Sequence, residues 1–124
     1  MTPEPDADLS PQEVIRLQVE ALSDNDEPHE DAGIETAFRF ASPANKRSTG
    51  PLNRFRKMVK GRRYNLMIDS ESASYGKMKR DDEHASQNVT LEKNGEKAVF
   101  KFSLSLQDSG EYEGCWMTDS VLRR

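Results

Sequence analysis

Apolar residues in the first half of the chain recur every three or four positions, as they do along one face of a helix. Val14, Leu17 and Ala21 lie on one such face. Ser10 stands directly before a proline and three positions before a glutamate, which is the arrangement of a capping box at a helix start. These features predict a first helix over residues 10–23.

Two further segments show the same helical period. A second helix is predicted over residues 31–41, and Pro43 ends it because a residue that precedes proline is steered out of the helical region. A third helix is predicted over residues 51–61, with Gly61 as its C-terminal stop. The polar residues 43–50 between these two helices are predicted to form a turn-rich connector.

From residue 64 onward the apolar positions alternate with polar ones, which is the period of a half-buried strand. Asn94-Gly95 joins two such runs and predicts a two-residue hairpin turn of type I′. Residues 70–83 are polar and are predicted to be strand ends around a mobile loop. Four strands are expected, over residues 64–69, 87–92, 100–106 and 112–122.

Helices first and strands second predict the α+β class, with three N-terminal helices packed on a curved four-stranded antiparallel sheet. The apolar face of such a sheet needs a cover, and the helices are the only cover available. A strongly twisted sheet wrapped on them would form a cone with a cavity at its open end. Residues 1–9, rich in proline and aspartate, are predicted to be a disordered tail before a single domain over residues 10–124.

Composition narrows the class of protein. The chain has 124 residues, 34% of them hydrophobic, and a single cysteine, so no internal disulfide is expected. No run approaches the roughly 18 apolar residues of a membrane span, and the first residues lack the features of a secretory signal. We therefore expect a cytoplasmic protein, or one of an organelle stroma if the chain comes from a eukaryote and has lost a transit peptide.

The net charge of −4 hides a strong asymmetry. Residues 1–36 hold eleven acidic side chains and one basic one, whereas residues 37–63 hold nine basic side chains and no acid. Such a positive segment could attract an acidic protein partner or an anionic ligand. The alternative, favoured here, is that it pairs with the acidic first helix or lies on the solvated side of the third. The basic residues in question are Arg54, Arg56, Lys57, Lys60, Arg62 and Arg63. Nucleic acid is not expected as a partner, because Phe55, the aromatic residue among these bases, has core spacing.

Three blocks of the sequence resemble a known family. They run from Gly33 to Asn45, from Thr49 to Leu52 and from Gly114 to Asp119, and the resemblance spans roughly residues 10–122. The family is an uncharacterised domain of unknown function. The resemblance implies a nuclear-transport-factor-2-like (cystatin-like) cone, whose wider superfamily includes isomerases, cyclases and dehydratases as well as non-catalytic binding or scaffold domains.

Asp119 is the candidate catalytic residue. Strict alternation along the last strand would place Cys115, Met117, Asp119 and Val121 on one face and Trp116, Thr118 and Ser120 on the other. A carboxylate among such apolar neighbours could act as a general base, with Thr118 or Tyr64 as a hydrogen-bond donor. The favoured alternative is that Asp119 ends the strand and pairs with Arg39 or a helix terminus.

Other polar residues are candidates for contacts with a ligand in the cone. They are Arg39, Ser42, Asn45, Thr49, Trp116 and Thr118. Ser42, Asn45 and Thr49 could equally serve only to satisfy the backbone groups of two helix ends. No metal and no cofactor is expected, because the histidines lie far apart in charged loops, the cysteine stands alone and no glycine-rich phosphate loop appears.

We predict from these features a non-catalytic binding or assembly module with a cone-shaped pocket, which could form a homodimer through the outer face of the sheet. The alternative is a small-molecule enzyme of the isomerase or cyclase type that uses Asp119.

Overall fold

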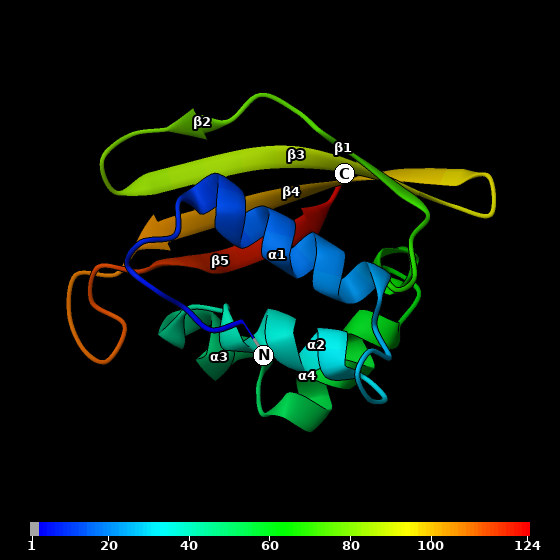
Figure 1. Cartoon of the computed structure of the whole chain (residues 1–124), viewed down its shortest axis with the longest axis horizontal. Helices are drawn as coiled ribbons and strands as arrows, with labels where there is room; N and C mark the ends of the chain where they lie inside the picture. Colours follow the sequence, from blue (N-terminus) through cyan, green and yellow to red (C-terminus); the bar gives the residue numbers. More distant parts are fainter. Residues whose placement is uncertain (1–2) are drawn as a thin grey trace.

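The computed structural model describes residues 3–124, in which four α-helices precede an antiparallel sheet of five strands (Figure 1). The helices are α1 (Pro11–Ser23), α2 (Ala32–Arg39), α3 (Pro43–Thr49) and α4 (Leu52–Lys60), followed by a short 3-10 helix, η1 (Asn65–Met67). The strands are β1 (Ser72–Tyr75), β2 (Lys79–Arg80), β3 (His84–Lys93), β4 (Glu96–Leu106) and β5 (Trp116–Arg123). The predicted α+β class, with the helices before the sheet, is confirmed.

The sheet runs in the order β1-β3-β4-β5, and β2 pairs with the other end of β3. The β3–β4 hairpin turns at Asn94 and Gly95, whose φ angles of 52° and 83° are the positive values that a type I′ turn requires. The hairpin prediction is therefore confirmed. In Figure 1, α1 crosses in front of the sheet, and α2, α3 and α4 gather below β5.

The core lies between the helices and one face of the sheet. From β3 and β4 it takes alternate residues, among them Val89, Leu91, Phe100, Phe102 and Leu104, all at most 1% exposed. Helix α1 supplies apolar side chains from its inner face: Val14, Ile15, Val19 and Leu22. The opposite face of the same strands carries serine, asparagine and lysine side chains.

The start of α1 is a complete capping box, as predicted. The Ser10 hydroxyl accepts a hydrogen bond from the Glu13 backbone N–H at 3.1 Å, and the Glu13 carboxylate accepts one from the Ser10 N–H at 2.9 Å. Both bonds satisfy backbone donors that the helix itself leaves free.

Replacing Ser10 with alanine is expected to lower the free energy of unfolding by about 1 kcal/mol, because the alanine removes the acceptor for the Glu13 N–H. Urea denaturation measures the change. Ser23→Ala is the control, because Ser23 lies at the other end of α1 and its hydroxyl only donates to the Glu20 carbonyl. Equal losses in the two variants would contradict the capping role.

The predicted connector over residues 43–50 is wrong, because it forms helix α3. Its sequence has no apolar stripe and buries none of its residues, so no helical period marks it. Ser42 caps this helix by accepting from the Asn45 N–H at 3.3 Å, and Pro43 occupies a first-turn position. The proline predicted to end the second helix thus begins α3, whereas α2 ends earlier, at Arg39.

The predicted strand over residues 64–69 is also wrong. Leu66 and Met67 are adjacent, yet each is only 4% exposed, and neighbouring residues of a strand cannot both face one core. The tight η1 turn buries both. Strand pairing with β3 begins instead in the segment predicted as strand ends and loop, where β1 and β2 bring the sheet to five strands.

The structure also tests the predicted start of the last strand and the predicted N-terminal tail. The last strand begins at Trp116 and not near residue 112, because residues 111–114 form turns. At the other end, residues 3–9 contain no helix or strand, and Leu9 packs against the core. Residues 1–2 lie outside the described residues, and the disorder expected over residues 1–9 stays a prediction.

Candidate functional site

A cavity of about 290 Å³ lies between the four α-helices and strand β5. Most of its wall is apolar, with side chains from α1, α2, α4, β4 and β5: Leu22, Ala37, Phe55, Val59, Phe102 and Val121. An engineered apolar cavity of roughly 150 Å³ already binds benzene. The space is therefore large enough for a small organic molecule.

A connected set of hydrogen bonds forms the polar end of this cavity, with Thr118 at its centre. Gln18 Nε2 on α1 donates to Thr118 Oγ1 at 2.6 Å, and Asn45 Nδ2 on α3 donates to the Thr118 carbonyl at 3.0 Å. The Thr118 N–H donates to the Phe40 carbonyl at 2.8 Å, and the Ser42 N–H donates to the Thr118 carbonyl at 2.8 Å. β5 is thereby fixed to α1 and to both helices that flank Ser42.

Three of the six predicted ligand contacts line this cavity: Asn45, Thr49 and Thr118. The other three do not line it. Ser42 is 2% exposed and caps α3, and Trp116 is 7% exposed in the core, with the Arg80 guanidinium 5.2 Å from its ring centroid. Arg39 borders a separate depression beside α1 and α2. The spacing of these residues in the sequence could not predict which of them line the cavity.

A buried polar residue of the cavity that the sequence analysis missed is Gln18, which is 3% exposed. It lies four positions after Val14 and four before Leu22, so it interrupts the apolar stripe of α1. A polar residue inside such a stripe needs a buried partner, and here that partner is Thr118. The interruption of the apolar stripe could therefore have indicated that Gln18 is a buried polar residue.

A bulge in β5 overturns the strict alternation predicted for this strand. Thr118 pairs with Leu104 and Ser120 pairs with Ser103, so Asp119 has no partner on β4. Beyond the bulge the alternation is reversed: Val121 lies on the core face of the sheet, because it pairs with the core residue Phe102. Asp119 and Val121 therefore do not share a face by simple alternation.

Asp119 borders the cavity, but the residue is exposed to solvent. Within residues 3–124 no ion pair joins its carboxylate to Arg39. The two predicted donors also lie at the cavity, although the Tyr64 hydroxyl already donates to the Val121 carbonyl at 2.9 Å. The geometry brings Asp119, Thr118 and Tyr64 to one place without burying the carboxylate.

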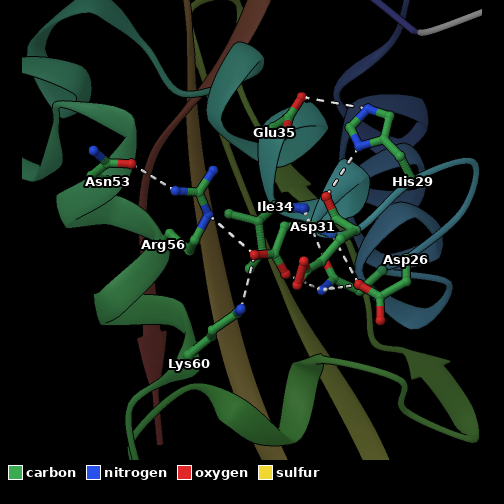
Figure 2. A network of polar contacts seen from close by, with 10 residues as sticks. Asp26, His29, Asp31, Ile34, Glu35, Asn53, Arg56 and Lys60 are labelled. Atoms are coloured by element: carbon green, nitrogen blue, oxygen red, sulfur yellow. Dashed lines mark hydrogen bonds and ion pairs between the residues drawn. The ribbon is translucent and has the colours of Figure 1, made fainter.

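Two residues of the positive segment are held by one buried acid, Asp31, at the start of α2 (Figure 2). Lys60 Nζ donates to Asp31 Oδ2 at 2.8 Å, and Arg56 Nε lies 3.2 Å from the same oxygen. Asn25 Nδ2 donates to the other carboxylate oxygen at 2.9 Å. The hydrogen bond from Lys60 is the main cause that lowers the pKa of Asp31, with further contributions from Asn25 and Arg56.

The intramolecular explanation of the positive segment thus holds for two of its six residues, with Asp31 as the partner in place of the first helix. The other four residues are exposed, and an acidic partner for them stays a prediction. They are Arg54, Lys57, Arg62 and Arg63.

The remaining candidates for nucleophilic or metal chemistry are Cys115 and the histidine and acidic side chains. Cys115 is buried, and burial raises the pKa of its thiol, which is the behaviour of an unreactive core cysteine. In the described part of the chain, histidine, cysteine and acidic side chains do not gather in threes as a metal-binding group would. Residues 3–124 also contain no helix with the length and apolar character of a membrane span.

A family model described as Domain of unknown function (DUF4864) matches residues 5–122. The chain belongs to this family. No curated protein and no solved structure matches the chain. The DUF4864 match includes all four helices and all of β5 except its last residue, so both walls of the cavity are built from residues of the family domain.

Proposed function

We propose that this DUF4864 domain is a non-catalytic binding module that holds a small, mostly apolar molecule in the cavity between its helices and β5. The observation that carries the proposal is the cavity itself, about 290 Å³ with a mainly apolar wall and one polar end. Ligand sites have this character in general, because apolar contacts supply affinity and a few fixed polar groups supply orientation.

The arrangement of elements supports a nuclear-transport-factor-2-like cone as the fold of this module. Helices precede the sheet in sequence, they cover one of its faces, and the cavity lies between the helices and β5, with Tyr64 in its lining. The hydrogen bonds of Thr118 to Gln18 and Asn45 hold the polar end in place before any ligand arrives. Such preorganisation lowers the entropic cost of binding.

Filling the cavity tests the proposal. Ala37 on α2 is 5% exposed and lines the cavity, so Ala37→Leu places three extra carbons inside it. Ala44 on α3 is exposed and lies outside the cavity, so Ala44→Leu adds the same side chain without filling anything. The probe is benzene, which enters apolar cavities of this class.

Benzene is expected to give saturable shifts of the Leu22, Val59 and Val121 methyl signals in NMR spectra of the wild-type protein and of Ala44→Leu. In Ala37→Leu the same titration is expected to give at least tenfold weaker binding, because the space is occupied. Equal binding by all three proteins, or no saturable binding by any of them, would contradict the proposal.

A second candidate, an isomerase- or cyclase-type enzyme, is favoured by one observation: Asp119, Thr118 and Tyr64 border the same cavity. We rank it lower because the Asp119 residue is exposed and the Tyr64 hydroxyl is already engaged with the Val121 carbonyl.

Asp119→Asn separates the two candidates. A binding module should keep its affinity for benzene and its unfolding free energy within about 0.5 kcal/mol of the wild type, since the change lies on the surface. The measurements are the same NMR titration and urea denaturation, with any ligand found on the natural protein offered as a substrate. If the wild type converts that ligand, and Asp119→Asn still binds it but no longer converts it, the enzyme hypothesis would be favoured over the binding module.

A further inference from the structure

The sheet face turned away from the helices carries a small depression surrounded by positive charge. Its volume is about 60 Å³, and it lies where the loop before β2 meets β3, β4 and the chain beyond β5. Two small polar side chains, Ser86 and Asn88, lie in it. The cationic side chains that border it are Lys77, Lys79, Lys101 and Arg124.

Strand pairing explains why these groups converge. Lys79 on β2 pairs with Ser86 on β3, and Lys101 on β4 pairs with Asn88 on β3. Ser86 and Asn88 are two positions apart, so they point to the same face of the sheet. Directly opposed side chains start about 4.5–5.5 Å apart, so the two lysines flank the polar pair from opposite sides of β3 within easy reach.

The cationic side chains at this depression have no close acidic partner in the described part of the chain. None of the four cations forms an ion pair with a carboxylate within residues 3–124. Two acids, Asp81 and Asp119, border a wider depression that shares Lys79, Ser86 and Lys101 with this one. Asp81 accepts hydrogen bonds from the backbone N–H groups of Glu83 and His84, so it is held by its own turn.

We propose that this depression binds a phosphate-type oxyanion, either free phosphate or a phosphate monoester. Lysine ammonium groups bind phosphate as point charges, and a serine hydroxyl and an asparagine amide add neutral donors. A depression of about 60 Å³ has room for one tetrahedral group. Phe100 and Phe102 point to the opposite face, so this surface lacks the stacking platform of a single-strand binder.

The test is an NMR titration of the ¹⁵N-labelled protein with inorganic phosphate at constant ionic strength. Saturable shifts are expected at the amides of Ser86, Asn88 and Lys101. The double variant Lys79→Gln/Lys101→Gln should bind at least about tenfold more weakly, because two charge-assisted contacts are lost. Lys97→Gln is the matched control, since Lys97 lies on the same face of β4 but pairs with Glu92, away from the depression.

Two further ligands, phosphoserine and a twelve-nucleotide oligothymidine, distinguish the sources of the phosphate group. Phosphoserine that binds at least as tightly as phosphate identifies a monoester site, and phosphate that binds more tightly identifies a free-anion site; both support the proposal. Oligothymidine that binds more than tenfold tighter than either would overturn it in favour of a nucleic-acid surface. Non-saturable shifts, or equal affinity in the double variant with unchanged urea denaturation, would also overturn it.

Discussion

Replacing Asp31 with asparagine is expected to lower the free energy of unfolding by about 2–3 kcal/mol near neutral pH, somewhat less than the roughly 3–5 kcal/mol for breaking a fully buried ion pair. The Asp31 residue is 7% exposed and its carboxylate holds both Lys60 and Arg56, which are themselves part exposed and can recover some hydration. Asparagine is the informative substitution because Asp31 has a φ of 60°, a left-handed conformation that asparagine also tolerates. The loss therefore reports the charge and not the backbone.

The same variant has a defined dependence on pH. The pKa of Asp31 lies below its ordinary value of 3.8 in the folded protein, chiefly because of the hydrogen bond from Lys60. A depressed folded pKa stabilises the fold fully above 3.8, and that stabilisation is lost as the pH falls below 3.8 through the folded pKa. The difference between the wild type and Asp31→Asn should therefore be constant near neutrality and shrink in acid.

Urea denaturation at pH 7 and at several acidic pH values measures this difference. Glu30→Gln is the control, because it makes the same charge change at the adjacent, exposed position. Its effect should stay within about 0.5 kcal/mol at every pH. A loss in Glu30→Gln as large as that in Asp31→Asn would show that net charge, and not the ion pair, is responsible.

Replacing Phe102 with alanine is expected to cost about 3–5 kcal/mol of unfolding free energy, as for other buried phenylalanines. Phe102 is 1% exposed, and its side chain forms part of the cavity wall. The truncation should also enlarge the cavity, so that naphthalene binds more tightly to Phe102→Ala than to the wild type. Urea denaturation and an NMR titration with naphthalene measure the two effects.

Phe100→Ala is the matched control for this prediction. Phe100 is 0% exposed and lies two positions away on the same face of β4, but it does not line the cavity. The two variants should lose similar stability, and only Phe102→Ala should bind naphthalene more tightly than the wild type does. Where a truncation to alanine leaves too little folded protein, Phe102→Leu and Phe100→Leu provide the same comparison at a lower cost in stability. An equal gain in naphthalene affinity in both variants, or a gain in neither, would contradict the assignment of the cavity wall.

Local signals in the sequence were sufficient for much of the fold. The capping box at Ser10 fixed the start of α1, and Asn94-Gly95 fixed the register of the β3–β4 hairpin. Both depend on residues close together in the chain, so neither requires knowledge of the tertiary structure. Helix α3 was missed because its stability comes from contacts of Ser42 and Asn45 with β5 and not from an apolar stripe.

The candidate site was predictable only in part, for the same reason. Asn45 and Thr49 were predicted as polar residues of a connector and Thr118 as a polar residue of the last strand, and all three line the cavity. The bulge at Asp119 depends on how β5 aligns with β4. This alignment is a property of the tertiary structure, so the alternation of residues along one strand cannot predict it. Gln18 interrupts the apolar stripe of α1, and this interruption is visible in the sequence. Its partner Thr118 lies 100 positions away, so the sequence could not identify the partner.

Native mass spectrometry of the protein purified from its own host tests the central claim most directly. The account predicts a complex of one chain with one small, mostly apolar molecule per cavity, present in the wild type and in Ala44→Leu and absent from Ala37→Leu. The protein at its bare mass in all three samples, or the same adduct retained by Ala37→Leu, would contradict a ligand bound in the cavity between the helices and β5.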